Sequence, residues 1–316
     1  MDDTARVHER GSIRWLGRWR SLIRGTSAVR ARSAPEPARC NGTPLFVGGC
    51  WRSGTTILHA LICTSPDVND YIGECSYFSA LVHSLAVGLE AFGIHTRYYF
   101  ASREELVAHH ASILRAELDR VWRRVGTPAV LALKDPLLTP SFPLLASTLP
   151  EARFVVSVRD PSDTLSSRIE VFRRMNGGAE PEAAQVRDLC GQYVATYRAV
   201  TDNFDAFAGR LCLIDYRSLV TGKHARLREF GLTRIEPGSV WRSGITDVRE
   251  HAGNPWLTPL YGRTLSAASL GRHRGRLSGE LQGLILDICG DVWRDLSRLA
   301  GQETGTYVTA LRENAA

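Results

Sequence analysis

The chain has 316 residues, of which 44% are hydrophobic and 23% are charged, and its formal net charge is +6. These fractions are ordinary for a folded globular protein, and so diffuse a basic excess excludes nucleic acid as the expected partner while it suits a small anionic ligand. Seven scattered cysteines without a C-x-x-C pair argue against a disulfide framework or a metal site; with no signal peptide and no apolar run long enough to cross a bilayer, they favour a cytoplasmic location.

The first 43 residues differ in composition from the rest of the chain. They include apolar side chains at helical spacing, set among arginines: Ile13, Leu16, Trp19 and Ile23. A basic amphipathic helix of this kind packs on its own domain, or makes weak contact with a membrane surface or a partner. Two prolines and several small residues in 31–43 are typical of a linker. The sequence therefore predicts a basic, partly helical extension and linker over 1–43 and one folded domain over 44–316.

The most informative stretch runs from Phe46 to Leu58. A short apolar run passes through glycines into helically spaced apolar residues, which predicts a strand, a tight loop and the start of a helix. Such a loop turns backbone N–H groups and the positive end of the helix dipole toward one point. Arg52 adds a positive charge there, and hydroxyl donors come from Ser53, Thr55 and Thr56. We therefore expect the loop to bind an oxyanion.

The spacing of two glycines in this loop, Gly49-x4-Gly54, matches the first part of the phosphate-binding P-loop. Thr55, however, stands where nucleoside-triphosphate enzymes have the lysine that contacts the β- and γ-phosphates. The anion is therefore not expected to be the γ-phosphate of ATP or GTP.

Further along the chain, apolar runs alternate with amphipathic helices. The pattern predicts helices over 78–89, 103–125, 161–176, 181–204 and 216–230, buried strands over 129–133, 154–158 and 211–214, irregular chain over 232–270 and a last helix capped by Ser278. Near-continuous apolar strands separated by helices are typical of a parallel sheet covered on both faces. The sequence therefore predicts an α/β fold, a P-loop-like three-layer domain with a central parallel sheet flanked by helices.

Charged residues follow three of the predicted strands: Arg52, then Lys134-Asp135-Pro136, then Arg159-Asp160. In open α/β sheets ligands lie at the carboxyl ends of the strands, so we expect these groups to converge. Together these motifs resemble the sulfotransferases that use 3′-phosphoadenosine 5′-phosphosulfate (PAPS), most closely the tyrosylprotein-sulfotransferase-like branch. The similarity runs from about Leu45 to Leu299, so the resemblance implies a sulfotransferase domain over most of 44–316.

The resemblance implies which residues bind this cofactor. Arg-Ser-Gly-Thr-Thr is the core of the family's 5′-phosphosulfate loop, which corresponds here to Arg52, Ser53, Gly54, Thr55 and Thr56. In the family's 3′-phosphate motif an arginine and a serine eight residues later grip the 3′-phosphate, and these residues are Arg159 and Ser167 here.

Two later segments extend this set. Tyr216 resembles a tyrosine that borders the nucleotide, and Gly271 to Ser278, with Arg272 and Arg274, is similar to a basic loop that closes over the cofactor. The spacing of Glu74 departs from the family pattern, since it lies two residues farther from Arg52 than in the tyrosylprotein enzymes, and two residue types depart from it as well. Trp51 replaces the proline usual before the arginine, and His273 stands where an aromatic residue, often tryptophan, is common.

The resemblance also implies the chemistry. An acceptor hydroxyl, or an amine, would attack sulfur in line, with adenosine 3′,5′-bisphosphate leaving. Glu74, in the family's Gly-Glu pair, would take the acceptor proton, and Lys134 and Arg52 would stabilise charge on the transferring group, so that no metal is needed. A small molecule, such as a specialised metabolite, is the expected acceptor, because a cytoplasmic enzyme does not meet secreted protein tyrosines.

Several alternatives stay open at this stage. His59, His83 or Asp70 could replace Glu74 as the base. Lys134 could be a structural ion-pair partner of Asp135, and Tyr216 could be a packed core residue. As alternative functions, the loop could belong to a P-loop kinase with a degenerate nucleotide motif, or the chain could be a non-catalytic nucleotide-binding or docking module.

Overall fold

A computed structural model of the chain describes residues 41–247, 254 and 256–300. These residues belong to one compact unit. The N-terminal extension expected over 1–43 lies almost wholly outside the described residues, so its helix and its contact with a membrane or partner stay predictions. Within the described ranges, no helix combines the length and the apolar character needed to span a bilayer.

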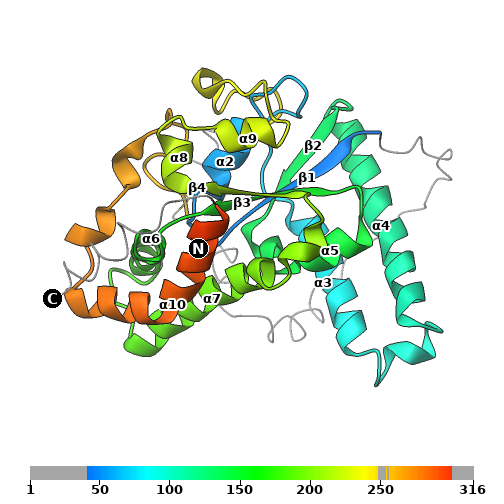
Figure 1. The fold of residues 1–316 in the computed structure, drawn as a ribbon, viewed down its shortest axis with the longest axis horizontal. Helices are drawn as coiled ribbons and strands as arrows, with labels where there is room; N and C mark the ends of the chain where they lie inside the picture. Colours follow the sequence, from blue (N-terminus) through cyan, green and yellow to red (C-terminus); the bar gives the residue numbers. More distant parts are fainter. Residues whose placement is uncertain (1–40, 248–253, 255, 301–316) are drawn as a thin grey trace. The chain divides into compact units, whose positions relative to one another are not determined.

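A four-stranded sheet forms the centre of the compact unit (Figure 1). The strands are β1 (Thr43–Gly48), β2 (Val130–Lys134), β3 (Arg153–Val158) and β4 (Leu211–Asp215). Their order is β2–β1–β3–β4, and every neighbouring pair is parallel. In each strand only the first residue is less than fully buried. Helices on both faces account for this burial and for the near-continuous apolar runs in the sequence. The predicted fold class is confirmed.

The helices divide between the two faces of the sheet and an α3–α4 hairpin at its β2 edge (Figure 1). Their bounds are α2 (Thr55–Ile62), α3 (Ser76–Glu90), α4 (Arg103–Arg124), α5 (Phe142–Thr148), α6 (Pro161–Met175), α7 (Ala183–Thr201), α8 (Tyr216–Val220), α9 (Ala225–Glu229) and α10 (Gly279–Leu299). Short 3-10 turns are η3 (Thr96–Tyr98), η4 (Pro136–Ser141), η5 (Phe204–Phe207), η6 (Pro237–Ser239), η8 (Ala267–Ser269) and η9 (Arg272–Gly275).

The sheet separates two hydrophobic cores because successive strand side chains point to opposite faces. Leu45 and Val47 of β1 pack in one core with residues of α2, α8 and α9. Phe46, between them, packs in the other core with residues of α3, α5, α6, α7 and α10. Each face of the sheet is thereby covered, and only the strand ends remain available for a ligand.

Helix boundaries agree with the caps expected from the sequence at two important places. The Asp160 carboxylate accepts a hydrogen bond from the Asp163 N–H at 2.9 Å, directly before Pro161 opens α6. The Ser278 hydroxyl accepts one from the Leu281 N–H at 3.3 Å and begins α10. Both side chains satisfy helix N–H groups that have no partner within the helix.

Two expectations about local structure are corrected. The single helix predicted over 216–230 is two short helices, α8 and α9. Gly222, with φ 82°, ends the first of them in the left-handed region that terminates helices. The pattern analysis also missed η4 and α5 between β2 and β3, a segment in which Pro136, Pro140 and Pro143 obscure the helical signal.

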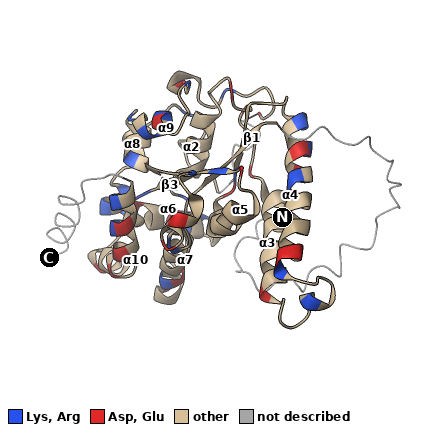
Figure 2. Cartoon of the chain, turned by 45° about the vertical axis from the view of Figure 1, so that its right-hand side comes forward, with Lys and Arg blue, Asp and Glu red and all other residues tan. Residues whose placement is uncertain are grey.

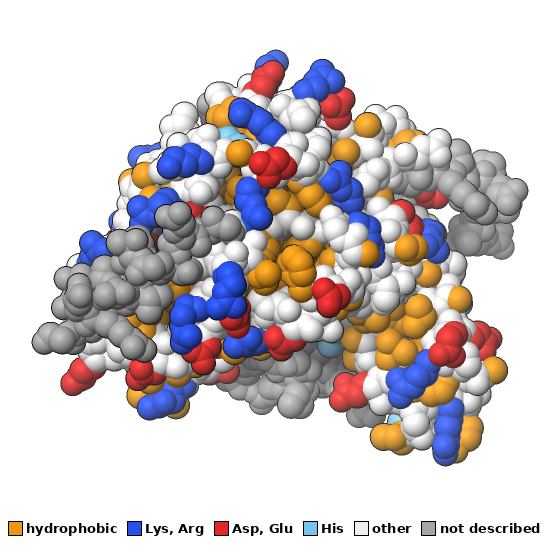
Figure 3. Space-filling model, in the orientation of Figure 1, with side chains coloured by type: hydrophobic (Ala, Val, Ile, Leu, Met, Phe, Trp, Pro, Cys, Tyr) orange, Lys and Arg blue, Asp and Glu red, His pale blue; other side chains and the backbone are white. Residues whose placement is uncertain are grey.

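Charge is distributed unevenly over the elements. Figure 2 shows strands and an α3 nearly free of charged residues, whereas α4 and α10 carry both signs. On the face shown in Figure 3, Lys and Arg side chains are interspersed with Asp and Glu rather than gathered into one basic patch.

Candidate functional site

The loop between β1 and α2 has a backbone that depends on glycine. Gly49, Arg52 and Gly54 have φ angles of 135°, 74° and 98°. A Cβ atom on Gly54 would lie 2.3 Å from Cδ2 of Tyr216, closer than any real contact. The carbonyl of Ser53 accepts a hydrogen bond from the Ser157 hydroxyl of β3 at 2.8 Å. Glycine is therefore required at 54 both for the turn and for the close approach of Tyr216.

A pocket opens at the carboxyl ends of β1, β3 and β4, in the place expected for a ligand of an open α/β sheet. Eight of the predicted cofactor residues line it: Arg52, Gly54, Thr55, Thr56, Arg159, Ser167, Tyr216 and Arg272. The structure therefore brings together residues that lie up to 220 positions apart in the sequence.

Two predicted cofactor residues do not line this pocket. Ser53 is fully buried, and its hydroxyl has no hydrogen-bond partner among the described residues. Arg274 is exposed and lies outside the lining, whereas Arg276 of the same loop lines the pocket and forms an ion pair with Glu170 of α6. The helical turn η9 explains the difference, because successive residues of a tight turn face different directions.

Arg159 holds the middle of the pocket. Its guanidinium donates to the carbonyl of Arg52 at 3.0 Å and to the carbonyl of Ser269 at 2.8 Å. It also lies 4.4 Å from the ring centroid of Tyr216, whose hydroxyl is 2.7 Å from that of Ser269. Tyr216 is thus packed in the core and also lines the pocket, and its contact with a nucleotide stays a prediction.

Arg52 makes the second polar connection across the pocket. Its Nε atom donates to the Ser167 hydroxyl at 3.1 Å, and its guanidinium also donates to the carbonyl of Trp256. Burial, together with repulsion from Arg174 and Arg159, lowers the pKa of Arg52 to about 10. Because several arginines share one lining, the pocket concentrates positive charge.

Five arginines face two carboxylates in the pocket lining: Arg52, Arg159, Arg174, Arg272 and Arg276, against Asp163 and Glu170. Arg174 was not predicted from the sequence, which also left open which arginine of 271–278 contacts the cofactor, Arg276 included. A signal for Arg174 was present, because Ser167, Glu170 and Arg174 follow one helix face at spacings of three and four. The irregular segment 256–269, which closes the other side, offered no comparable pattern.

Glu74 and Lys134 form a separate ion pair beside the loop. Glu74 Oε1 lies 2.6 Å from Lys134 Nζ, and the same Nζ lies 3.3 Å from the Thr56 hydroxyl. The lysine side chain is 2% exposed and the glutamate side chain 41%. Neither residue lines the arginine pocket, but Thr56 does, so Lys134 connects the exposed carboxylate to the edge of the loop.

The partner of Lys134 is therefore Glu74, and the alternative pairing with Asp135 is not what the structure shows. Asp135 instead accepts hydrogen bonds from the Ser79 hydroxyl at 2.6 Å and from the Leu137 N–H at 2.9 Å. Burial raises the pKa of Asp135 above its ordinary value. Its role is to cap η4 and to tie that turn to α3.

The other candidate bases are placed less favourably. His59 is fully buried, its Nε2 lies 3.1 Å from the Ala132 carbonyl, and burial with the nearby charge of Lys134 lowers its pKa to about 3. His83 is exposed on α3, and Asp70 accepts a hydrogen bond from the Gly244 N–H at 2.7 Å. Among these four residues, only Glu74 forms an ion pair with Lys134.

Trp51 has a structural explanation for its departure from the family pattern. The guanidinium of Arg168 lies 4.2 Å from its ring centroid, and the ring of Trp256 packs against it at 5.4 Å. Arg168 is itself buried and donates to the Leu189 carbonyl at 2.9 Å. Trp51 therefore connects the loop to α6 and to the segment that contains Trp256.

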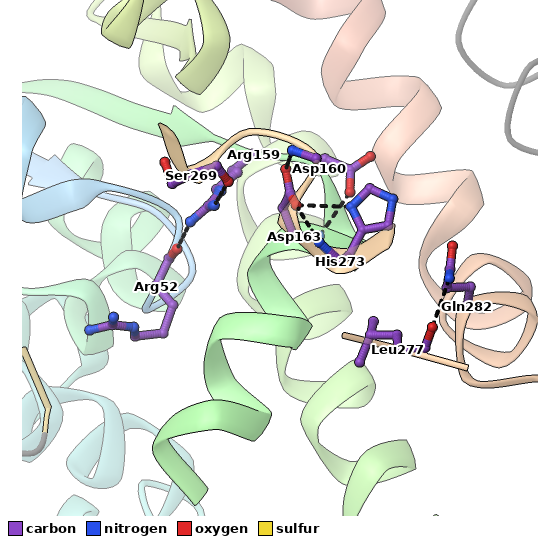
Figure 4. A network of polar contacts seen from close by, with 9 residues as sticks. Arg52, Arg159, Asp160, Asp163, Ser269, His273, Leu277 and Gln282 are labelled. Atoms are coloured by element: carbon purple, nitrogen blue, oxygen red, sulfur yellow. Dashed lines mark hydrogen bonds and ion pairs between the residues drawn. The ribbon is translucent and has the colours of Figure 1, made fainter. Parts of the chain in front are cut away.

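His273, the other departure in residue type, lies in a buried polar network at the start of α6 (Figure 4). Its Nδ1 atom and its backbone N–H both donate to Asp163 Oδ1, at 2.9 and 3.2 Å, and the Gly271 N–H donates to Oδ2 at 2.8 Å. Although burial alone would raise it, the hydrogen bonds from His273 and the backbone and the charge of Arg159 lower the pKa of Asp163 below its ordinary value.

Asp160 completes this network. Ligand atoms of Asp160, Asp163 and His273 lie within 4.8 Å of one another, a spacing at which a metal ion could bind. The sequence did not indicate this cluster, because 110 positions separate Asp163 from His273. Both oxygens of Asp163 already accept N–H hydrogen bonds, so the carboxylate is satisfied by the chain itself.

Comparisons with known proteins agree with the motifs. A model described as "Sulfotransferase family" matches residues 44–230, more than half of the chain. The chain belongs to the sulfotransferase family. Membership favours sulfuryl transfer over the kinase alternative, and the matched region holds the β1–α2 loop, Glu74, Lys134 and Arg159.

Individual relatives show how far the similarity extends. Protein-tyrosine sulfotransferase 1 of Danio rerio is 29% identical over 128 residues, which cover 40% of this chain and 35% of the relative, so the chain matches about a third of that protein's length. The sulfotransferase domain of the Synechococcus PCC 7002 olefin synthase matches 82% of this chain and 98% of its own, with 15% identity and a TM-score of 0.48. The sulfotransferase domain from the curacin biosynthetic pathway matches 79% and 98%, with 14% identity and a TM-score of 0.48.

Replacing Gly54 tests the close approach of Tyr216. We expect Gly54→Ala to lower the free energy of unfolding, measured by urea denaturation, by about 1–3 kcal/mol for the strained φ plus the displacement of Tyr216. Gly178→Ala is the matched control, since Gly178 has φ 92° with nothing near its Cβ position. Equal losses in the two variants would contradict the contact with Tyr216.

The lowered pKa of Asp163 predicts a pH-dependent stability. A carboxyl group with a depressed pKa stabilises the folded state above its unfolded value, about pH 4, and this contribution is lost as pH falls through the folded pKa. We expect Asp163→Asn to lose about 1–3 kcal/mol of unfolding free energy at pH 7. The difference from wild type shrinks in denaturation curves recorded down to pH 3. A difference that does not change with pH would show that the charge of Asp163 contributes nothing.

Proposed function

We propose that this sulfotransferase binds PAPS in the arginine-lined pocket and transfers the sulfuryl group to a hydroxyl, or an amine, of a small molecule. The observation that carries the proposal is the convergence of five arginines, two of them from the strand-end motifs, on one pocket. Five arginines against two carboxylates leave an excess of positive charge, which a ligand with several negative charges would stabilise. A nucleotide with phosphate at one end and phosphosulfate at the other fits this requirement.

The residues divide between the two ends of that nucleotide. Arg52, Gly54, Thr55 and Thr56 would surround the 5′-phosphosulfate at the N-terminus of α2, with Ser53 supporting the loop from its buried side. Arg159 and Ser167 would hold the 3′-phosphate, Tyr216 would border the nucleotide and Arg272 would close the site. In the segment 271–278, called the late loop below, Arg276 rather than Arg274 is the second arginine that lines the pocket, so we include it among the cofactor residues.

PAPS, when bound, supplies an activated sulfuryl group, and adenosine 3′,5′-bisphosphate is the product. The exposed carboxylate of Glu74 would accept the proton of the acceptor hydroxyl. Lys134, between Glu74 and Thr56, would place a positive charge where negative charge develops, and Arg52 would do so from the loop. Arginine and lysine thus provide the cationic role, and the proposal includes no metal.

A small-molecule acceptor is supported by the surroundings of Glu74. Tyr77, the second residue of α3, and Leu137, three residues after Lys134, are both large, exposed hydrophobic side chains. They offer an apolar surface to an acceptor whose hydroxyl reaches Glu74.

The six described cysteines are free thiols, in keeping with the proposed reducing, cytoplasmic setting.

Titration calorimetry with adenosine 3′,5′-bisphosphate tests the cofactor. We expect metal-independent binding that Arg159→Ala weakens by at least about tenfold, because the charge-assisted contacts of one guanidinium are worth about 1.5–3 kcal/mol. Arg115→Ala, which removes an exposed arginine paired with Glu151 on the α4 side, is the control and should bind as wild type does. Binding of ATP with Mg²⁺ alone would refute the proposal, and binding of neither nucleotide would favour a docking module.

Substitution of Glu74 tests the base. We expect Glu74→Gln to lower kcat about 10²–10⁴-fold, the usual contribution of a general base, in an assay that follows bisphosphate release with a phenolic acceptor. Affinity for adenosine 3′,5′-bisphosphate should change less than about threefold, since Glu74 lies outside the arginine pocket. Asp70→Asn is the matched control. A variant Glu74→Gln with wild-type kcat would remove Glu74 from the mechanism.

A further inference from the structure

The late loop is attached to α6 at two places, one buried and one half-exposed. Asp163, in the first turn of α6, accepts hydrogen bonds from Gly271 and from both the backbone and the ring of His273. About two turns further along α6, Glu170 forms an ion pair with Arg276. The Asp163–His273 contact is the more deeply buried, with side chains 5% and 3% exposed, against 32% for each side chain of the Glu170–Arg276 pair.

Arg272 lies between these attachments and differs from its neighbours. It is exposed and lines the pocket, while His273, the next residue, is buried against Asp163. Within the described part of the chain, Arg272 has no ion pair or side-chain hydrogen bond, and Arg276 is already neutralised by Glu170. Arg274 lies outside the pocket lining, so among the described residues Arg272 is the arginine of this loop that lines the pocket without an ion pair, and it directly precedes the buried His273 in η9.

The helix that anchors the loop is the one that carries the proposed 3′-phosphate residues. Arg159 precedes α6 and also binds the Ser269 carbonyl, just before the loop, while Ser167 follows Asp163 by one turn. A loop held at Ser269, Gly271 and His273 is thus fixed relative to Arg159 and Ser167. Movement of Arg272 relative to these residues requires breaking hydrogen bonds to a buried carboxylate, which is costly.

We propose that Asp163 and His273 are positioning residues that hold Arg272 over the 3′-phosphate of the nucleotide, and so set the preference for a 3′-phosphorylated nucleotide. This inference rests on the proposed function. Another aromatic residue at position 273 would fill the same space. The imidazole of His273 adds an N–H group that donates a charge-assisted hydrogen bond to Asp163. Discrimination then depends on two residues that lie outside direct contact with the phosphate.

The test compares two ligands, adenosine 3′,5′-bisphosphate and adenosine 5′-monophosphate, by titration calorimetry. The dissociation constant of the monophosphate divided by that of the bisphosphate gives a ratio that measures what the 3′-phosphate contributes to binding. We expect Arg272→Ala to lower this ratio about ten- to a hundredfold, as loss of one charge-assisted contact does. His273→Phe, which keeps the ring and removes the N–H donor, should lower the ratio to a similar extent while the affinity for the monophosphate changes less than about threefold.

Four further variants separate positioning from stability. His273→Asn retains a donor near the position of Nδ1 and should restore most of the discrimination, and Asp163→Asn, which keeps an acceptor oxygen, should lie between wild type and His273→Phe. In an Arg272→Ala background, His273→Phe should cause no further loss of discrimination, because the two residues act through one contact. Glu170→Gln, which releases the other attachment, should have the smaller effect.

The possible failures are distinguishable. If the wild-type protein binds both nucleotides equally, the proposed function fails. If wild type discriminates but His273→Phe weakens both ligands alike, adds its loss to that of Arg272→Ala or equals Glu170→Gln in effect, His273 is only structural and the inference fails. Should His273→Phe not fold, Asp163→Asn and His273→Asn decide the question by the same ratio.

Discussion

The guanidinium of Arg159 connects the parts of the candidate site. It stands at the end of β3, donates to the carbonyl of Arg52 in the β1–α2 loop and to the carbonyl of Ser269 in η8, and lies over the ring of Tyr216 after β4. The Arg159 carbonyl in turn accepts a hydrogen bond from the buried Tyr193 of α7 at 2.9 Å. A planar group with donors on several sides can make these contacts at once, which a lysine could not do. This one guanidinium therefore contacts all three segments that contain Arg52, Ser269 and Tyr216.

The positive charge of the pocket is the energetic counterpart of this arrangement. Several arginines held close together repel one another, and this repulsion adds to burial in lowering the pKa of Arg52. The fold tolerates it because α6 brings Asp163 and Glu170 to the same surface and because β-sheet, helices and loops are fixed by packing elsewhere. Charge that is unfavourable in the empty fold becomes favourable when an anion binds, which is how a binding site differs from a structural ion-pair cluster.

The two departures in residue type from the family pattern strengthen contacts within this chain rather than weaken the site. Trp51 gives the loop an aromatic contact with Trp256 and a cation–π contact with Arg168. His273 gives the late loop a buried partner in Asp163. Both residues attach a loop to α6, so this helix acts as the common support of the pocket, with Ser167, Glu170 and Arg174 on its exposed side.

The sequence by itself determined the parallel α/β fold, most element boundaries and the strand-end motifs, because burial on two faces, glycine turns and helix caps are local signals. It also identified eight residues that line one pocket. Only the tertiary structure decided that Lys134 pairs with Glu74 and not with Asp135, and that His59 is sealed in the core. It alone showed that Arg276 lines the pocket while Arg274 does not, and that Asp163 meets His273. These outcomes depend on where separate segments meet and which way a tight turn faces, and neither is encoded in periodicity or spacing along the chain.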